Sequence, residues 1–535
     1  MATRQALTPD AATWARFAPL RDAEWQLVQA CATGEIAKIG LRRPEAASAE
    51  TRLRATFLAW VLCGGLPLRG DRLELVGAHI EGRLDLGDAH IAASVWFYRC
   101  RFDAPVLLDG AQVAGSVTFA GCRLQGLLAD GCHIGKDLAI HAGTVVDGEL
   151  RLRRARIGGD LDCARLDLSG SGQAAPLRRA LLADGVSIGG DVRLTDGFQA
   201  VGDVQFVAAQ VRGDFLASGH FSGSAREDGR RGCALLLDRL EVGGSLCFTG
   251  GFGAAGCVSL QRARVGGDLD ATGASFDWLG DAGWTGDSSL QMTRARIGGT
   301  LVLRELMAPL SAASLADAQL GALADDGSTW GERLVLDGLR YRRLAEGSPA
   351  DAAFRIDWLQ RQEPAHLGAR FRPQPWRQAI RVLRRMGHEQ AADSLALRRE
   401  RTLRLAGVIG AGAPAALRWL PRLGHGLLGL LAGHGYRPGW LAAWLAGAWL
   451  LCGAVYGAAA EQGAVRAAAF SPWAYSFDRL LPMAGIQAPG TWITGSIWGE
   501  AMHWLSLAET GFGWLAWALL LASVAGWLDR DRRAR

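Results

Sequence analysis

One phrase returns along this chain: ARIGGDLD at 155–162, ARVGGDLD at 263–270 and ARIGGTLV at 295–302. The phrase is part of a longer sequence repeat. Similar units start at 73, 84, 95, 106, 117, 127, 138, 150 and 161, with gaps of 10 to 12 residues. Such regular spacing is the signature of a solenoid, in which each unit stacks on its neighbours.

Within each unit the first, eighth and usually the third positions are apolar, and the sixth is small. The small residues are Ala78, Ala89, Cys100, Ala111, Cys122, Cys132, Gly143 and Ala155. This alternation, interrupted by glycine, predicts two short strands joined at a corner. Two units make a coil of about 22 residues, so we expect a right-handed parallel β-helix. Cys100, Cys122 and Cys132 would replace alanine in an interior column as small apolar side chains.

The coils alternate in length after residue 161. The Ile or Val before the glycine pair falls at 134, 157, 188, 211, 242, 265 and 297, with gaps of 23 alternating with 31 or 32. The extra residues, such as SGSGQAAPLRR (169–179) and SGSAREDGRRG (222–232), are polar and rich in Gly and Ser. We expect them to form loops on one side of the solenoid, where repeat proteins often bind their partners.

Two residue classes that often mark metal sites have simpler explanations here. The aspartates after the glycine pair (Asp160, Asp191, Asp214 and Asp268) do not recur at the nine-residue period of calcium-binding repeats, so we expect them to close turns. The ten cysteines form no CxxC and have no zinc-finger spacing, and the N-terminal sequence has no apolar run of the kind found in secretory signals. We therefore expect the cysteine-bearing part to lie in a reducing cytoplasm.

Arginine is concentrated before the apolar C-terminal stretches. From Leu339 to Arg404, 15 arginines stand against seven acidic residues, a local charge of +8 compared with +5 for the whole chain. Residues 371–404 predict a helix, a Gly-His turn and a second helix. We expect anionic lipid headgroups to be bound by Arg381, Arg384, Arg385, Arg398 and Arg399. The alternative is that these arginines only form an ordinary solvated helix face. We do not expect nucleic acid as a ligand, because no aromatic side chains on which bases could stack are interleaved with the arginines.

Two stretches, 439–460 and 504–527, are long and apolar enough to cross a membrane, the second interrupted only by Glu509 near its start. Arginines flank the pair, whereas the loop between them carries only Arg466 and Arg479. The positive-inside rule then places both termini and the β-helix on the cytoplasmic side of the inner membrane, with 461–503 outside or dipping into it. Residues 417–435 are too short to span and should lie on the inner face.

These assignments divide the chain into four parts: a helical cap (1–70), the parallel β-helix (71–306), a linker with an Arg-rich helical juxtamembrane module (307–438), and two transmembrane helices with a Trp-rich loop (439–535). The chain resembles bacterial membrane proteins with a pentapeptide-like β-solenoid, a PQPY-type helical module and a two-helix tail. The resemblance rests on three stretches: the solenoid, FRPQPWRQAIRVLRRMGHEQAADSLALRRER, and YSFDRLLPMAG (475–485). At Trp376 and Ala379-Ile380 the sequence differs from the usual PQPY-x-QLA motif. Some of these proteins are labelled membrane-associated oxidoreductases, although no residue pattern in this chain supports that label.

The first functional hypothesis is therefore a membrane-tethered cytoplasmic scaffold that presents one-sided loops to a protein partner. The alternative is an ion-channel-like or sensing protein, possible as a homo-oligomer, for which Asp478, Arg479 and Glu509 are the candidate membrane residues. An enzyme is the third hypothesis. Because nucleotide-binding, zinc-protease and nucleophile-elbow motifs are absent from the sequence, we assign no catalytic, cofactor-binding or metal-binding residue.

Overall fold

The computed structural model describes residues 16–170, 179–224, 232–276, 289–410, 414, 417–436, 438–465, 470–481, 492–493 and 497–534. It divides into two compact units, which we describe separately. Unit 1 comprises residues 1–349 with 357–363, and unit 2 comprises residues 350–356 with 364–535.

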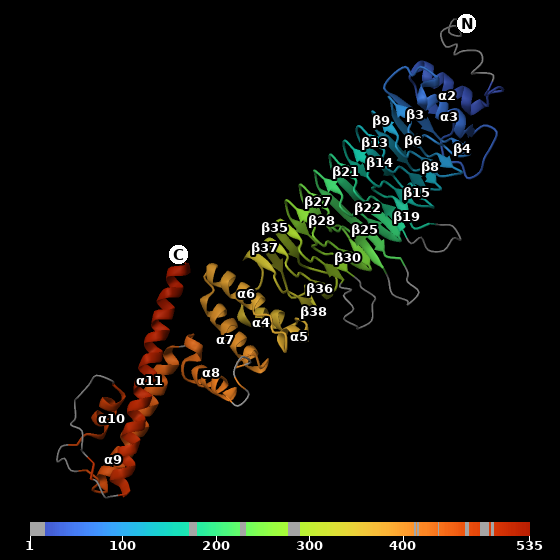
Figure 1. Ribbon diagram of the computed structural model, residues 1–535. Helices are drawn as coiled ribbons and strands as arrows, with labels where there is room; N and C mark the ends of the chain where they lie inside the picture. Colours follow the sequence, from blue (N-terminus) through green and yellow to red (C-terminus); the bar gives the residue numbers. More distant parts are fainter. Residues whose placement is uncertain are drawn as a thin grey trace. The chain divides into compact units, whose positions relative to one another are not determined.

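Unit 1 is a parallel β-solenoid of about 12 turns with a repeat of about 23 residues (Figure 1). The named strands of unit 1 pair in parallel, and the described strands form one sheet of 29 strands and a second of 10. Each coil has four sides, which we call faces A to D in chain order. The predicted coil of about 22 residues is confirmed.

The strands stack in four columns, one for each face. Face A contains β1 (Ala37–Lys38), β3 (Arg72–Val76), β6 (Ser94–Tyr98), β10 (Val117–Ala120), β14 (Leu138–His141), β18 (Leu161–Asp162), the first parts of β22 (Val192–Val201) and β25 (Phe215–Ser222), β28 (Leu246–Cys247), β32 (Leu269–Asp270), and the last parts of β35 (Arg296–Leu303) and β37 (Gln319–Asp325). Face B contains β2 (Arg52–Arg54), β4 (His79–Glu81), β7 (Arg101–Phe102), β11 (Arg123–Leu124), β15 (Val145–Val146), β19 (Asp167–Leu168), the last parts of β22 and β25, β29 (Gly253–Ala255) and β33 (Ser275–Phe276).

Faces C and D complete each coil. Face C contains β8 (Val106–Leu107), β12 (Leu127–Leu128), β16 (Leu150–Arg151), β20 (Arg179–Leu182), β23 (Asp203–Gln205), β26 (Cys233–Leu236), β30 (Cys257–Ser259), β34 (Leu290–Gln291), β36 (Leu310–Ser314) and β38 (Trp330–Val335). Face D contains β5 (His90–Ile91), β9 (Gln112–Val113), β13 (His133–Ile134), β17 (Arg156–Ile157), β21 (Ser187–Ile188), β24 (Gln210–Val211), β27 (Glu241–Val242), β31 (Arg264–Val265), and the first parts of β35, β37 and β39 (Arg340–Leu344), whose last part continues on face A.

The repeated phrase builds the corner between faces D and A. In its copy at 155–162, Ala155 and Ile157 are buried in the interior. A Cβ on Gly158 would lie 2.2 Å from the carbonyl oxygen of Gly135 in the preceding coil, so only glycine fits this position. Asp160 Oδ1 accepts the backbone N–H of Asp191 in the following coil at 2.8 Å. The aspartates therefore join successive coils, a role beyond the turn closure that we expected.

The interior is filled by apolar side chains. Cys100, Cys122 and Cys132 are at most 1% exposed, which confirms their predicted place in the interior columns. One void of about 10 Å³, lined only by apolar residues that include Phe97 and Phe119, lies in the first coils. That volume is at most enough for a single water molecule.

Cys233 and Cys257 face each other in register on β26 and β30 and form a disulfide with a Cα–Cα distance of 4.2 Å. The sequence had suggested a reducing compartment for this region, where such bonds are uncommon.

The three long insertions leave the solenoid at one corner. The chain passes from face B to face C between Leu168 and Arg179, between Ser222 and Cys233, and between Phe276 and Leu290. Most of the inserted residues lie outside the described part of the chain, so their predicted loop conformation is not addressed. Their attachment points are nevertheless all on one side of unit 1, as the alternating coil lengths predict.

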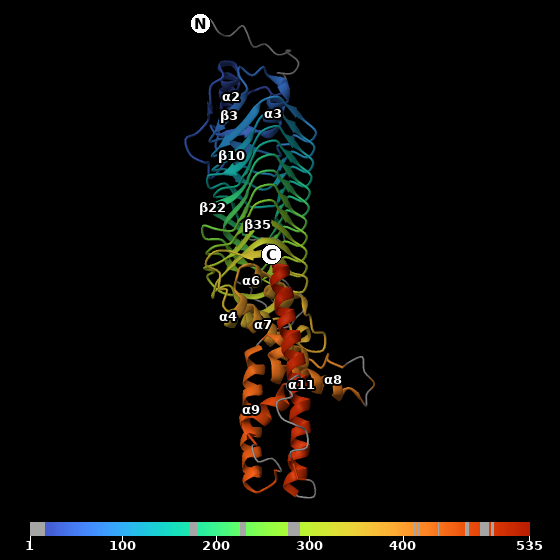
Figure 2. The same cartoon turned by 90° about the vertical axis from the view of Figure 1, so that its left-hand side faces the viewer.

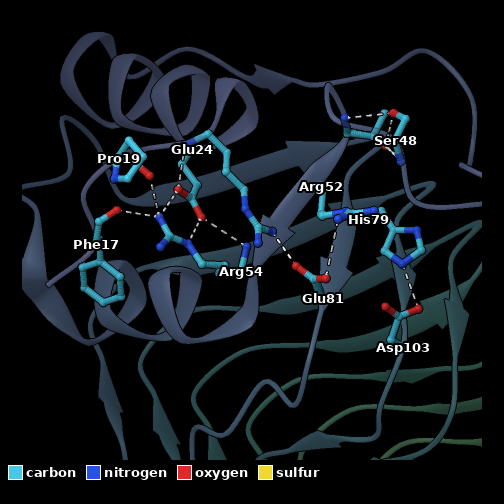
Figure 3. Close-up of polar contacts among 11 residues, drawn as sticks. Phe17, Pro19, Glu24, Ser48, Arg52, Arg54, His79, Glu81 and Asp103 are labelled. Atoms are coloured by element: carbon cyan, nitrogen blue, oxygen red, sulfur yellow. Dashed lines mark hydrogen bonds and ion pairs between the residues drawn. The ribbon is translucent and has the colours of Figure 1, made fainter.

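The N-terminal cap is only partly helical. It contains α2 (Asp22–Thr33), α3 (Ala55–Trp60) and the π-helix η1 (Val61–Gly65), but β1 and β2 pair with β3 and β4 and begin the solenoid itself. The buried Glu24 carboxylate binds the guanidinium of Arg54, which also donates to the carbonyl oxygen of Phe17 (Figure 3). This ion pair ties α2 to β2.

The solenoid extends beyond the expected boundary at residue 306. β36 to β39 continue the parallel pairing as far as Leu344. Trp358 in α4 (Ala352–Gln360) is 2% exposed and its ring lies 5.8 Å from that of Trp330 in β38. This aromatic contact helps to cover the open edge of the last coil, a position at which an uncovered sheet would be prone to aggregation.

Unit 2 is helical. Two helices form the Arg-rich module, α6 (Gln374–Arg385) and α7 (Glu389–Leu405), and the Gly-His turn predicted at 387–388 separates them. The other helices are α5 (Pro364–Leu367), α8 (Trp419–Ala432), η3 (Gly433–Gly435), α9 (Pro438–Glu461), α10 (Pro472–Leu480) and α11 (Ile497–Ala534). α9 and α11 lie side by side (Figure 2) and are long and apolar enough to cross a membrane over Gly439–Glu461 and Ile497–Ala522.

We expect Gly266→Ala to destabilise unit 1. The added Cβ would lie 2.3 Å from the carbonyl oxygen of Gly243, and backbone atoms cannot move without separating two coils. A loss of about 2 kcal/mol or more is typical of such overpacking. Gly327→Ala is the matched control, because nothing lies within 4 Å of its Cβ position. Denaturant unfolding followed by circular dichroism of the full chain in detergent measures both, and equal effects would contradict the close packing of coils.

Acid should also destabilise unit 1. Burial raises the pKa of Glu24, but hydrogen bonds from Arg54 and from backbone N–H groups outweigh it, so the net pKa lies below the ordinary 4.5. The Asp160 pKa is likewise lowered below 3.8, with burial outweighed by the N–H of Asp191 and by Arg193. A depressed folded-state pKa gives stability above the unfolded pKa that is lost as pH falls through the folded value.

We therefore expect the unfolding free energy to decline below about pH 4.5. The decline should be shallower in the Glu24→Gln/Asp160→Asn double variant. An unchanged slope in urea titrations of this variant between pH 3 and pH 6 would contradict the assignment.

Candidate functional site

A third, shorter helix packs beside the two long apolar helices of unit 2. α10 packs against both α9 and α11. Two glycines permit the close approach: a Cβ on Gly453 of α9 would lie 2.4 Å from the ring of Trp473, and a Cβ on Gly513 of α11 would lie 2.5 Å from the carbonyl oxygen of Leu480. These contacts bring α10 close to both α9 and α11.

Glu509 joins the three helices. Its carboxylate accepts hydrogen bonds from the Tyr456 hydroxyl of α9 at 2.7 Å and from the Ser476 hydroxyl of α10. Glu509 is 4% exposed and Ser476 is fully buried. A buried carboxylate without partners is costly, and here the two hydroxyl donors compensate for its loss of water.

The structure changes the position expected for Glu509. The sequence placed it near the start of a span at 504–527, but α11 begins at Ile497 and its apolar span is Ile497–Ala522. Glu509 therefore lies 12 residues into this segment. The start was misjudged because the polar residues Glu500 and His503 interrupt the apolar run.

Asp478 and Arg479, the other two candidate membrane residues, both lie on α10. Asp478 is 6% exposed, and the Arg479 guanidinium carbon lies 4.8 Å from the ring centroid of Tyr475. Tyr475 in turn accepts a hydrogen bond from Trp492 Nε1 at 3.0 Å. The three predicted residues are thus part of one compact region of α9, α10 and α11.

Sequence reasoning missed Tyr456 and Ser476 because it did not recognise α10. A local signal was present: Ser471 caps the helix by accepting the N–H of Ala474, and Pro472 occupies its first turn. Ser followed by Pro is a common way to start a helix.

The predicted lipid-binding arginines differ in their environments. Arg384 pairs with Asp393 at 2.9 Å, and Arg399 pairs with Glu400, so both charges are partly neutralised within the chain. The remaining three, Arg381, Arg385 and Arg398, are exposed.

α8 has an apolar exposed side and a polar inner side. Its exposed apolar residues include Trp419, Leu420, Leu423, Leu427 and Leu430. On the inner side, His425 Nε2 lies 3.2 Å from Glu400 Oε2 of α7. At its C-terminal end, the carbonyl oxygen of Leu430 accepts a hydrogen bond from Trp444 near the start of α9.

His434, just after α8, lies against His425 with 4.3 Å between ring centroids. Burial lowers its pKa, and the adjacent His425 lowers it further. The neutral form of His434 is therefore favoured at neutral pH.

Among the described residues, no group of three or more His, Cys, Asp or Glu side chains is arranged to hold a metal ion. Comparison with protein family models, with curated proteins and with solved structures finds no match to this chain.

We expect Glu509→Ala to loosen the membrane hairpin. It leaves the Tyr456 hydroxyl without its acceptor and the Ser476 hydroxyl with only the Trp449 carbonyl oxygen at 3.2 Å, and hydrogen bonds to charged groups contribute about 1.5–3 kcal/mol each. Thermal unfolding in detergent, followed by limited proteolysis of the loop between α9 and α10, would report the change. Glu500→Gln on the exposed side of α11 is the control. Equal melting temperatures for the two variants would contradict the anchoring role of Glu509.

Proposed function

We propose that this chain is a membrane-tethered scaffold. Unit 1 provides a rigid surface for a protein partner, and the α9–α11 hairpin of unit 2 anchors it in the bilayer. The observation that carries the proposal is that one chain combines two features. The interior of its solenoid is filled, so only the outer faces are left for interactions, and two of its apolar helices are long enough to span a membrane. The common corner of the three insertions supports a one-sided binding surface.

Lipid contacts extend the anchor beyond the two spans. The exposed apolar side of α8 would lie at the bilayer surface, because α8 bonds to the beginning of α9 through Leu430 and Trp444. Exposed Arg381, Arg385 and Arg398 would meet anionic headgroups. The intramolecular partners of Arg384 and Arg399 make these two weaker candidates.

The proposed location is the inner membrane, with both termini and the solenoid in the cytoplasm. The support is the arginine content before α9 and after the second span, compared with the arginine-poor loop between them. The disulfide between Cys233 and Cys257 is the feature that opposes it. Sidedness is therefore the property that most needs measurement.

An ion-conducting or sensing tail remains the second candidate, and Glu509 is the observation that favours it, because buried acidic residues within spans commonly serve ion or proton movement. Its known partners, however, are hydroxyls of its own hairpin, which suits an anchor equally well. The oxidoreductase label gains no support from the described residues.

The test combines membrane extraction with thiol labelling. We expect the full chain to resist alkaline carbonate extraction. In intact spheroplasts, an impermeant maleimide should label a Gln462→Cys variant, whose thiol lies in the loop after α9, but not the exposed native Cys63 of the cap. Both should react after permeabilisation. Labelling of Cys63 without permeabilisation would show that the topology is the reverse of the proposed one. Extraction of the chain by carbonate would contradict the membrane anchor.

A further inference from the structure

Three successive coils carry a ladder of arginines on face D and at the corner between faces C and D. Its members are Arg239, Arg262, Arg264, Arg294 and Arg296, and all are exposed. The register is fixed by pairing, with Glu241 opposite Arg264 and Arg264 opposite Arg296. Neighbouring parallel strands lie about 4.8 Å apart, so the side chains recur at that interval along the solenoid.

Three of these arginines occupy an unfavourable backbone conformation. Arg239, Arg262 and Arg294 have φ values of 59°, 60° and 60° in the left-handed region. At the same corner, other coils place glycine, as at Gly131 and Gly185, or another residue in the same conformation, as at Asp88, Arg154, Ala208 and Asp317. A side chain other than glycine costs about 1–2 kcal/mol in this region. The corner itself imposes this conformation, and three adjacent coils fill it with arginine although glycine would avoid the cost.

Intramolecular pairing uses only part of this charge. Arg264 pairs with Glu241 at 3.2 Å and Arg294 with Asp317 at 3.6 Å, both at exposed positions where ion pairs contribute little. For Arg239, Arg262 and Arg296, no ion pair is formed with any residue in the described parts of the chain.

A strip without side chains runs beside the ladder. The first glycine of each pair, at Gly243, Gly266 and Gly298, is exposed and follows the arginine-bearing strand. Each of these glycines stacks on the backbone of the coil before it. A bound chain can therefore approach the backbone of the solenoid while its acidic side chains reach the arginines.

We propose that this arginine ladder binds a short acidic segment of a partner protein in extended conformation. The proposal rests on the scaffold function and specifies the chemistry of its partner. The arginines of the first and third coils of the ladder are about 10 Å apart, which is the length of roughly three residues of extended chain. An acidic side chain at every second residue would reach the guanidinium groups, which bind carboxylates with two hydrogen bonds.

Other anionic partners fit this surface less well. Single-stranded nucleic acid binds through aromatic side chains on which its bases stack, and the exposed ladder positions hold only arginine and glutamate. A continuous anionic bilayer would meet Glu241 and Asp317 on the same face, whereas a peptide can place its acids opposite arginines alone.

The test measures binding of a fluorescein-labelled (Glu-Ser)₄ peptide to the full chain in detergent by fluorescence anisotropy, with (Gln-Ser)₄ as the peptide control. We expect saturable binding of the acidic peptide that weakens with salt. Replacing Arg262, Arg264, Arg294 and Arg296 by Gln should weaken it at least tenfold. The matched variant removes four exposed arginines of unit 2 to which no role is assigned, Arg370, Arg377, Arg401 and Arg404, and should bind like the parent.

A second variant separates binding from folding. Arg262→Gly/Arg294→Gly relieves two left-handed positions, so it should raise the melting temperature of unit 1 while it weakens peptide binding. Unchanged affinity in this variant, equal losses in the two four-arginine variants, or absence of peptide binding would overturn the inference. Ladder-dependent binding of phosphatidylserine vesicles or of oligo(U) in place of the peptide would also overturn it. None of these results would alter membrane extraction or sidedness, so the scaffold proposal is tested separately.

Discussion

The close approach of successive coil backbones is the constraint on which unit 1 depends. At the corner between faces D and A most coils place glycine, with Ala114 and Arg212 among the exceptions, and an added Cβ would lie 2.1 Å from the preceding carbonyl oxygen at Gly189 and 2.3 Å at Gly266. This contact keeps the strands within hydrogen-bonding distance on every face. It also explains why the phrase at 155–162 recurs, because each coil must present the same backbone at the same place.

Stacking in register has a second consequence, since each position in the coil becomes a column along the solenoid. Inside, the columns form apolar stacks, such as the rings of Phe198, Phe221 and Phe252, whose successive centroids are 5.1 and 5.2 Å apart. At the corner, aspartate side chains accept the N–H of the next coil. Outside, the same repetition aligns single arginines into a ladder along three coils.

The sequence predicts those parts of the fold that depend on local repetition. Coil length, the interior cysteines and the side of the insertions all follow from spacing alone. The last coils were missed because the glycine pair and the small sixth residue become irregular after residue 306, although β36 to β39 still pair. Cap strands β1 and β2 were missed because they are two and three residues long and receive their partners only from the first full coil.

The membrane site shows the same limit. Glu509 stands out in the sequence as an acid in an apolar stretch, but Tyr456 and Ser476 become its partners only when three helices pack together, 53 and 33 residues away along the chain. No periodicity links such residues. The Asp160 contact with Asp191 is similar, because its 31-residue separation includes an insertion of variable length.

The tethered-scaffold account depends on a hairpin that anchors one chain and does not close into a pore. Mass photometry of the full-length protein in nanodiscs tests this directly. The account predicts a monomer or a simple dimer, with the Glu509 carboxylate satisfied within each hairpin. A closed ring of three or more chains would contradict it, because the tail would then surround a common axis as channel subunits do.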